Sequence, residues 1–445
     1  MIRILSRACL ACLVSSLVAT AAWAQAPASP RPPNILLVIA DDMGRDASPC
    51  HDLGAAKPNM PVLTELCREG LVFDNAWSQP VCSPTRATIL TGRYGFRTGV
   101  LDAVGPRARS GGIGFGEVSL HRLLDAQAPV RYDHAVIGKW HLGDALNGGA
   151  NSPGGMGVGH YSGVLIGELR DYYSVPLTTN GITREVTGYA TTVLTDEALR
   201  WLAGRASPWF LWLAYTAPHV PFHAPPADLL RQKLPDASTA IQADPRPYYF
   251  AALEALDHEL GRLLDSLPPA TRAETIVMFL GDNGTPPRVA QLPYGPNTAK
   301  GTLFPGGITV PLVVSGAGVT RRGQREAAPV NTTDLYATIA DLAGIPRVAA
   351  EDSFSFKSLL QSPADPPRNW AYAEYRSGEP GLARNNGWTI RDERHQLLVL
   401  DTGRRALFDL AGDPGGRRDL LREPTPADAA IAARLSAWGA ELRGR

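Results

Sequence analysis

Short apolar runs recur along the chain, and each of them ends in a cluster of polar residues. Residues 34–40 and 275–280 are apolar, bounded by turn-forming residues and rich in aliphatic side chains, which is typical of buried strands. The polar residues that follow these two runs carry carboxylate or amide oxygens: Asp41, Asp42, Asp282 and Asn283. Oxygen donors are therefore expected at the ends of two buried strands.

Two further runs end in basic or imidazole side chains. Residues 135–138 lead into Lys139 and His141, and residues 208–215 lead through a proline into His219. Helical periodicity lies between the runs, over three ranges: 61–70, 192–203 and 249–267. Strands that alternate with helices predict a mostly parallel α/β sheet with helices on both faces, and such sheets gather their sites at the carboxyl ends of the strands. We therefore expect the four polar clusters to converge.

The pattern changes near residue 345. A helical pattern over 331–344 ends at a glycine that is soon followed by Pro346, which predicts a domain boundary. Beyond it, short strand patterns and a closing helix from Pro426 predict a smaller antiparallel α+β unit. We expect a large domain over 25–345 and a smaller C-terminal domain over 346–445.

The first residues resemble an export signal. Arg3 and Arg7 precede an apolar stretch that ends in Ala22-Trp23-Ala24, so we expect residues 1–24 to be a signal peptide, cleaved after Ala24. The mature protein would be exported, either periplasmic or secreted, without a membrane anchor. Lys plus Arg and Asp plus Glu both number 43, so no net charge attracts nucleic acid, and we expect a small or polymeric substrate.

Signal cleavage would leave three cysteines in an oxidising compartment, which is an odd number. Cys50 and Cys67 are near enough in sequence to close a short loop, but the sequence leaves their pairing open. Cys82, followed closely by Arg86, is the better candidate for special chemistry.

The polar clusters suggest a hard cation and a bound anion. Carboxylate and amide oxygens without sulfur or imidazole suit Ca²⁺ or Mg²⁺ rather than zinc, although either pair alone more often forms an ordinary turn. The chain has only five lysines, and two of them, Lys139 and Lys300, lie in glycine-rich stretches beside other polar candidates. A compact ammonium can contact a tetrahedral anion and donate a proton, whereas an isolated lysine is usually a solvated surface residue.

Six short motifs follow one another along the chain. The first is Cys82-Ser83-Pro84-Thr85-Arg86, which has the form Cys-x-Pro-x-Arg. Five more blocks follow: ATILTGRY, IGKWHLG, APHVPF, FLGDNG and KGTLFPGG. In sequence and order these motifs resemble those of type I sulfatases in the alkaline phosphatase superfamily. The resemblance extends from about Pro33 to residues 407–414, and it implies an alkaline-phosphatase-like sheet with a small C-terminal domain.

The resemblance also implies a modified nucleophile and a metal. Cys82 would be oxidised to formylglycine by a formylglycine-generating enzyme, and its hydrate would attack the sulfur of a sulfate monoester. A geminal diol keeps a second hydroxyl, so it can expel sulfate and restore the aldehyde, whereas a serine ester would be stable. The implied ligands of Ca²⁺, with Mg²⁺ as an alternative, are Asp41, Asp42, Asp282, Asn283 and residue 82 itself.

Roles for the remaining site residues are implied in the same way. Arg86 would steady residue 82, and Lys139 and Lys300 would contact sulfate oxygens. His219, with Lys300, would protonate the leaving alcohol, and His141 would remove the proton that triggers sulfate release.

One stretch departs from the family, because Pro305 and Thr309 stand where the resemblance leads us to expect Glu and Arg. The expected activity is hydrolysis of sulfated small molecules or glycans. Two alternatives remain: a phosphonate monoester or phosphodiester hydrolase on the same scaffold, and a binding protein for sulfated polymers with Cys82 unconverted.

Overall fold

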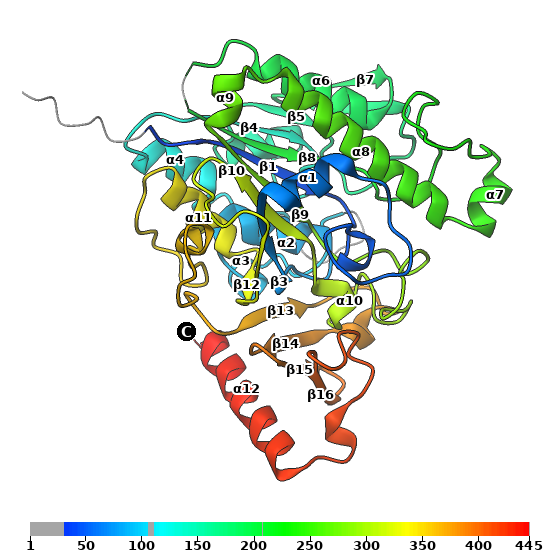
Figure 1. The fold of residues 1–445 in the computed structure, drawn as a ribbon, viewed down its shortest axis with the longest axis vertical. Coiled ribbons are helices and arrows are strands. Elements are labelled where there is room, and N and C mark those ends of the chain that lie inside the picture. The colour runs from blue at the N-terminus through cyan, green and yellow to red at the C-terminus, as the bar shows by residue number, and fades with distance from the viewer. Residues whose placement is uncertain (1–30, 106–110, 207, 445) are drawn as a thin grey trace, which may run out of the picture. The chain divides into compact units, whose positions relative to one another are not determined.

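A ten-stranded sheet forms the centre of the molecule, shown as a ribbon in Figure 1. The structure is a computed structural model that describes residues 31–105, 111–206 and 208–444, so the predicted signal peptide lies outside the described residues. In spatial order the strands are β11 (Gln324–Glu326), β2 (Gly70–Phe73), β10 (Leu312–Gly316), β9 (Thr275–Gly281), β1 (Asn34–Ala40), β8 (Trp209–Ala214), β4 (Asp133–Gly138), β5 (Tyr161–Gly163), β6 (Ser174–Thr179) and β7 (Ile182–Thr187).

The middle of this sheet is parallel. Strands β9, β1, β8, β4 and β5 are consecutive neighbours that run in the same direction, whereas β10 and β6 pair with their neighbours in antiparallel fashion. The mixed, mostly parallel sheet predicted from the sequence is therefore confirmed. The four strands that precede the polar clusters are adjacent, so their carboxyl ends lie at one edge of the sheet.

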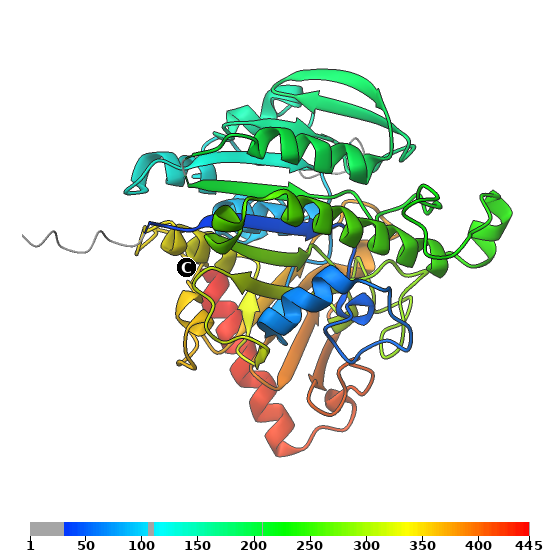
Figure 2. The ribbon, with the colours of Figure 1, turned by 45° about the horizontal axis from the view of Figure 1, so that its top comes forward.

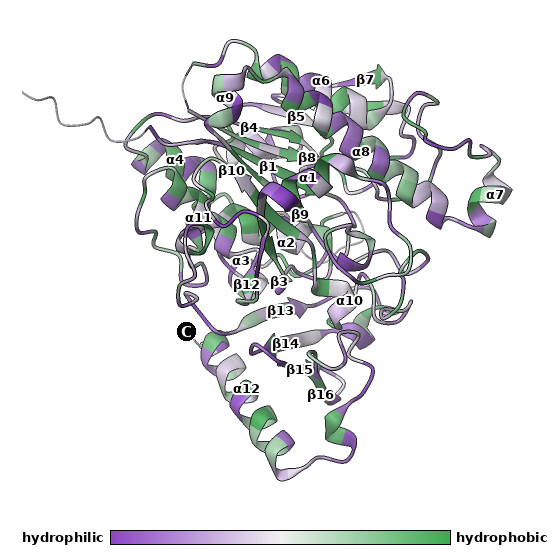
Figure 3. Ribbon diagram, in the orientation of Figure 1, coloured by the Kyte–Doolittle hydropathy of each residue, from purple (hydrophilic) through white to green (hydrophobic). Residues whose placement is uncertain are grey.

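Helices cover both faces of the sheet, as Figure 2 shows from a second direction. Alternate residues of β1 enter two different cores, because successive side chains of a strand point to opposite faces. One core includes residues of α2 (Cys82–Thr91), α4 (Leu120–Gln127) and α11 (Asp334–Leu342). The other includes residues of α1 (Pro61–Glu69), α6 (Ala190–Leu202) and α8 (Arg246–Ser266). Hydropathy follows this layering, with apolar central strands in Figure 3.

A second, four-stranded antiparallel sheet follows in the C-terminal part, as predicted. It consists of β13 (Ala371–Tyr375), β14 (Gly387–Arg391), β15 (His395–Leu400) and β16 (Arg405–Asp409), and it is followed by α12 (Pro426–Gly444). One of its faces packs against Trp77 and Ile308, and the other packs against α12. The domain boundary near residue 345 remains a prediction.

The remaining elements are short. Strands β3 (Ala76–Trp77) and β12 (Val330–Asn331) pair with each other. The other α-helices are α3 (Gly95–Thr98), α5 (Ser152–Gly155), α7 (Ser238–Ala243), α9 (Pro269–Ala273) and α10 (Pro305–Ile308). Within the described residues, no helix has both the length and the apolar character that crossing a bilayer requires.

Candidate active site

The four polar clusters meet at the carboxyl edge of the parallel strands. Asp41 and Asp42 follow β1 directly, and Asp282 and Asn283 follow the neighbouring strand β9. The backbone N–H of Asp42 donates to Oδ1 of Asp282 over 2.9 Å, and Nδ2 of Asn283 donates to Oδ1 of Asp42 over 2.8 Å. Asp42 has a φ of 76°, a left-handed conformation that turns its side chain back toward the cluster. All four side chains are buried.

The donor set fits a hard cation. Oδ1 of Asn283 is buried and has no hydrogen-bond partner, which is costly unless another group uses its lone pairs. The same cluster contains three buried carboxylates, those of Asp41, Asp42 and Asp282, and burial followed by repulsion from Asp41 raises the pKa of Asp282 to about 6. Ligand atoms of Asp41, Asp42, Cys82 and His219 also lie within 4.8 Å of one another. An oxygen-rich, negatively charged cluster of this kind suits Ca²⁺ or Mg²⁺.

Cys82 opens helix α2 and points into this cluster. Its Sγ lies 3.3 Å from Oδ1 of Asp41 and 3.9 Å from Oδ1 of Asp42. Burial, and then the negative charge of Asp41, raises the pKa of the thiol, so residue 82 is uncharged as cysteine. Cys50 and Cys67 form a disulfide, which leaves Cys82 as the free cysteine of the described residues.

Arg86 lies one helical turn after Cys82, on the same side of α2. Its Nε and Nη2 donate to Oδ2 of Asp282 over 3.1 and 2.7 Å, and its Nη1 donates to the carbonyl of Lys139 over 2.7 Å. The guanidinium is fully buried and stays charged because of its partner carboxylates. Arg86 therefore ties the start of α2 to the ends of β9 and β4.

The two predicted lysines enter the cluster from different segments, and each pairs with a different carboxylate. Nζ of Lys139 lies 2.5 Å from Asp41 and 3.4 Å from Sγ of Cys82, and Nζ of Lys300 lies 2.5 Å from Asp42. Burial alone would lower the pKa of both ammonium groups, but the neighbouring carboxylates outweigh it and raise both. Two fixed positive charges thus flank residue 82.

The two predicted histidines lie in the site with one ring nitrogen of each held by the backbone. Nε2 of His141 lies 2.8 Å from the carbonyl of Val104, which leaves its buried Nδ1 without a partner. Nδ1 of His219 lies 2.9 Å from the carbonyl of Val220, and its Nε2 lies 3.7 Å from Asp42. Burial, followed by nearby lysines, lowers the pKa of His141 far below its usual value and that of His219 to about 3. Both imidazoles are therefore neutral at pH 7.

All ten predicted site residues therefore meet in one cluster. The structure adds two backbone features that the sequence analysis did not identify. The Val104 carbonyl sets the tautomer of His141, and Gly167 lies so close to that imidazole that an added Cβ would be 2.3 Å from Nε2. The Val104 carbonyl is an atom that every residue has, so its residue type carried no signal. Gly167 matters because it lacks a Cβ, but it is one of 44 glycines in the chain and does not stand out among them.

The stretch that departs from the family forms the short helix α10. Oγ1 of Thr309 donates to the carbonyl of Pro305 over 2.6 Å and is within 3.0 Å of the hydroxyl of Tyr294. Neutral hydrogen bonds therefore brace this loop, where the family resemblance led us to expect a charged pair.

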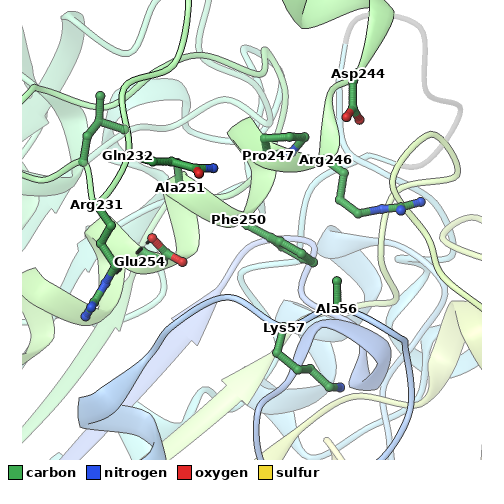
Figure 4. A pocket seen from close by; sticks show the side chains of 11 residues that line it. Ala56, Lys57, Arg231, Gln232, Asp244, Arg246, Pro247, Phe250, Ala251 and Glu254 are labelled. Atoms are coloured by element: carbon green, nitrogen blue, oxygen red, sulfur yellow. Dashed lines mark ion pairs between the residues drawn. The ribbon is translucent and has the colours of Figure 1, made fainter.

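A separate cavity of about 490 Å³ lies away from these residues, between α8 and the segment around Lys57 (Figure 4). Arg231 and Glu254 in its lining form an ion pair at 3.9 Å, and Nζ of Lys57 donates to backbone carbonyls. The lining contains none of the predicted site residues. We therefore assign the chemistry to the cluster around Cys82.

Comparison with known proteins identifies the family. The model of the family described as Sulfatase matches residues 33–345. The chain belongs to the sulfatase family. It is 31% identical to N-acetylgalactosamine-6-sulfatase from Mus musculus, over 76% of this chain and 68% of that protein. It is 27% identical to arylsulfatase A from Bos taurus, over 90% of this chain and 86% of that protein.

Solved structures agree on the fold of this sulfatase family member. The crystal structure of Ps i-CgsB in complex with k-i-k-neocarrahexaose matches with a TM-score of 0.75 and 24% identity, over 92% of this chain and 93% of that chain. The chain spans 64–68% of the length of the N-acetylgalactosamine-6-sulfatases that it matches. The chain thus shares its family and its fold with these proteins, and its own residues determine which substrate it binds.

Proposed function

We propose that the protein hydrolyses sulfate monoesters to an alcohol and inorganic sulfate, with formylglycine at position 82 supplying the nucleophile. The observation that carries the proposal is the place of Cys82, which lies within 3.9 Å of Asp41, Asp42 and Lys139 in a buried cluster of charges. The aldehyde, once hydrated, offers two hydroxyls on one carbon in place of the thiol. One attacks sulfur, and the other later loses its proton so that sulfate leaves.

The cation would be held by Asp41, Asp42, Asp282 and Asn283, with residue 82 as a further ligand. A bound Ca²⁺, or Mg²⁺ in its place, would lower the pKa of the attacking hydroxyl and draw charge from the sulfuryl oxygens. Arg86 holds residue 82 and Asp282 in fixed positions relative to each other. It lies on α2 together with residue 82, and it is hydrogen-bonded to Asp282.

Positive charge for the sulfuryl group comes from the two lysines. Lys139 and Lys300 are held by Asp41 and Asp42 on either side of residue 82, so they are positioned before a substrate binds. Fixed charges of this kind stabilise a transition state without the cost of reorganising solvent.

His141 and His219 carry out the proton transfers. Because Nε2–H of His141 donates to Val104, its free Nδ1 is the atom that can accept the proton of the second hydroxyl. His219 has its Nδ1–H on Val220, so Nε2 is the atom that exchanges a proton with the leaving alcohol. An anionic sulfate ester bound beside it would raise its pKa, and the protonated Lys300 lies on the same side of Asp42.

The wider setting is part of the same proposal. Formation of formylglycine requires a formylglycine-generating enzyme that acts on the Cys82 segment, and the predicted signal at residues 1–24 would export the protein to the periplasm or the medium. Residues 25–345 would form the catalytic domain, and residues 346–445 the smaller C-terminal domain. Sulfated small molecules or glycans are the substrates.

Two measurements test the proposal. Tandem mass spectrometry of the peptide that contains residue 82 is expected to find an aldehyde, and free cysteine in fully active protein would refute it. Initial rates with 4-nitrophenyl sulfate, 4-nitrophenyl phosphate and a phenyl phosphonate ester are expected to favour the sulfate. Preference for the phosphonate would support the alternative hydrolase, and no turnover of any ester would support a binding protein.

A further inference from the structure

A large cavity opens next to the active-site cluster, beside the C-terminal sheet. Its volume is about 870 Å³, and its lining comes from residues 287–304, 382–385 and 400–422. Of the ten predicted site residues, only Lys300 lines it, and Nζ of Lys300 lies 2.5 Å from Asp42. The cavity is thus connected to the cluster through one side chain.

The lining of this cavity is strongly basic, although the chain as a whole has no net charge. It contains five basic side chains and one acidic side chain, a formal charge of 5 − 1 = +4: Lys300, Arg384, Arg404, Arg417, Arg422 and Asp419. Oδ1 of Asp419 already accepts the backbone N–H groups of Leu407 and Leu421. This acid is therefore held by backbone groups, and the five basic side chains still leave the lining with a net positive charge.

Three of these arginines have no carboxylate partner among the residues that the structure describes: Arg384, Arg404 and Arg422. Arg417 differs, because it pairs with Asp413 at 3.4 Å. The guanidinium of Arg404 lies over the ring of Phe304, 5.6 Å from its centroid, which fixes its position. Like charges gathered in a hollow repel one another, and the field they create attracts an anionic ligand.

The cavity is also built to hold a larger group than a single ion. Nδ2 of Asn385 donates to the carbonyl of Gly301 over 3.0 Å, so the segment that carries Arg384 is tied to the segment that carries Lys300. Apolar surface from Phe304 and Leu382 lies among the charged groups. Apolar faces combined with a few fixed polar groups are typical of sites for organic ligands.

We propose that this cavity, the arginine cavity, binds a second anionic group of the substrate, a sulfate or carboxylate on the sugar next to the one whose ester is cleaved. The inference rests on the proposed function, because Lys300 places the reacting sulfate at one end of the cavity. Arg384, Arg404 and Arg422 then bind the second anion through charge-assisted hydrogen bonds. The substrate class is a glycan with several anionic groups, in preference to a monoanionic aryl sulfate.

The test compares wild type with an Arg384→Ala/Arg404→Ala/Arg422→Ala variant by isothermal titration calorimetry. Sucrose octasulfate, oligogalacturonate and sucrose serve as sulfated, carboxylated and neutral probes. Turnover of 4-nitrophenyl sulfate is measured in parallel. Arg347→Ala is the matched control, because Arg347 is exposed and lies outside the cavity lining.

Wild type and Arg347→Ala are expected to bind at least one charged probe, and sucrose not at all. The triple variant is expected to lose at least about tenfold in that affinity, and more than it loses in kcat/KM on 4-nitrophenyl sulfate. The charged probe that binds more tightly identifies the anion. Equal affinity in wild type and the triple variant, or equal affinity of wild type for a duplex DNA oligonucleotide, would overturn the inference. A wild type that hydrolyses no sulfate ester would instead refute the proposed function.

Discussion

The sulfur of Cys82 lies 3.3 Å from Oδ1 of Asp41, where the first turn of α2 meets the carboxyl end of β1. This contact places the end of side chain 82, where the hydroxyls of the proposed formylglycine hydrate would lie, among the groups proposed to hold the cation. A smaller hydroxyl at the same position would keep its place beside Asp41, because α2 is buried along its whole length.

The first prediction concerns Cys82→Ser. The serine hydroxyl can accept the sulfuryl group, but the resulting ester has no second hydroxyl on its carbon, so His141 finds no proton to remove. We expect at most one equivalent of alcohol per enzyme from an aryl sulfate, and an intact mass that shows sulfate retained on the protein. Cys82→Ala is the control, with no release at all. Sustained turnover by the serine variant would contradict a mechanism in which the second hydroxyl is needed to release sulfate and restore the aldehyde.

The second prediction concerns the cation site. Asn283→Ala removes the buried oxygen that has no protein partner, so we expect the purified variant to hold less Ca²⁺ or Mg²⁺ by elemental analysis. Adding either cation should then raise its melting temperature less than that of wild type. Asn283→Asp keeps an oxygen at this position and should retain the cation. Equal metal content in wild type and Asn283→Ala would exclude this residue as a ligand.

The third prediction tests the position of His141. Gly167→Ala would place a methyl group 2.3 Å from Nε2 of His141, so the imidazole and residue 167 must move apart, which disturbs the contact of Nε2 with the Val104 carbonyl. A displacement of about 1 Å at a general base can lower kcat by about 100-fold. Gly154→Ala is the control, because its Cβ would meet no atom within 4 Å. Unchanged kcat in the Gly167 variant would argue against a proton-transfer role for His141.

Much of this arrangement could be predicted because it depends on residue types at strand ends. The apolar run 34–40 coincides with β1, and the acids that follow it enter the cluster because parallel neighbours end at the same edge. Contacts made by backbone atoms, such as Val104 with His141, depend on how loops pack, and no residue type reports them.

The arginine cavity could not be predicted from the sequence, for a different reason. Arginine is abundant throughout this chain, so Arg384, Arg404 and Arg422 do not stand out in the sequence. They come together only because three C-terminal segments lie beside the loop of Lys300: the one before β14, the turn between β15 and β16, and the segment after β16. Charge clusters assembled from distant segments require the tertiary fold, whereas the net charge of zero gave no indication of them.

The fourth prediction concerns the disulfide between Cys50 and Cys67, whose pairing the sequence left open. The two residues are 17 positions apart, and cross-linking a loop of this length restricts the unfolded chain by about 3 kcal/mol. Cys50→Ser/Cys67→Ser should lower the free energy of unfolding by about 2–3 kcal/mol in urea titrations. The peptide containing residue 82 should keep its aldehyde, because neither cysteine contacts Cys82. Unchanged stability would show that the cross-link is not formed in the native protein.

The fifth prediction concerns the pH dependence of stability through Glu374, which is 4% exposed on β13. Burial raises its pKa to about 7, although its Oε1 accepts the backbone N–H of Phe96 over 2.8 Å. In the unfolded chain the pKa is near 4.5, so between about pH 4.5 and 7 the folded state binds more protons than the unfolded state.

The direction in which the unfolding free energy changes with pH follows from that difference in bound protons. The free energy of unfolding should fall as pH rises through this window, by about 2–3 kcal/mol from Glu374 alone. Glu374→Gln cannot lose a proton, so its unfolding free energy should depend less on pH, and its advantage over wild type should grow toward pH 7. Glu274→Gln, at an exposed position, is the control and should follow the wild-type profile. Parallel profiles for wild type and Glu374→Gln in urea titrations would show that this carboxyl is already ionised at pH 5.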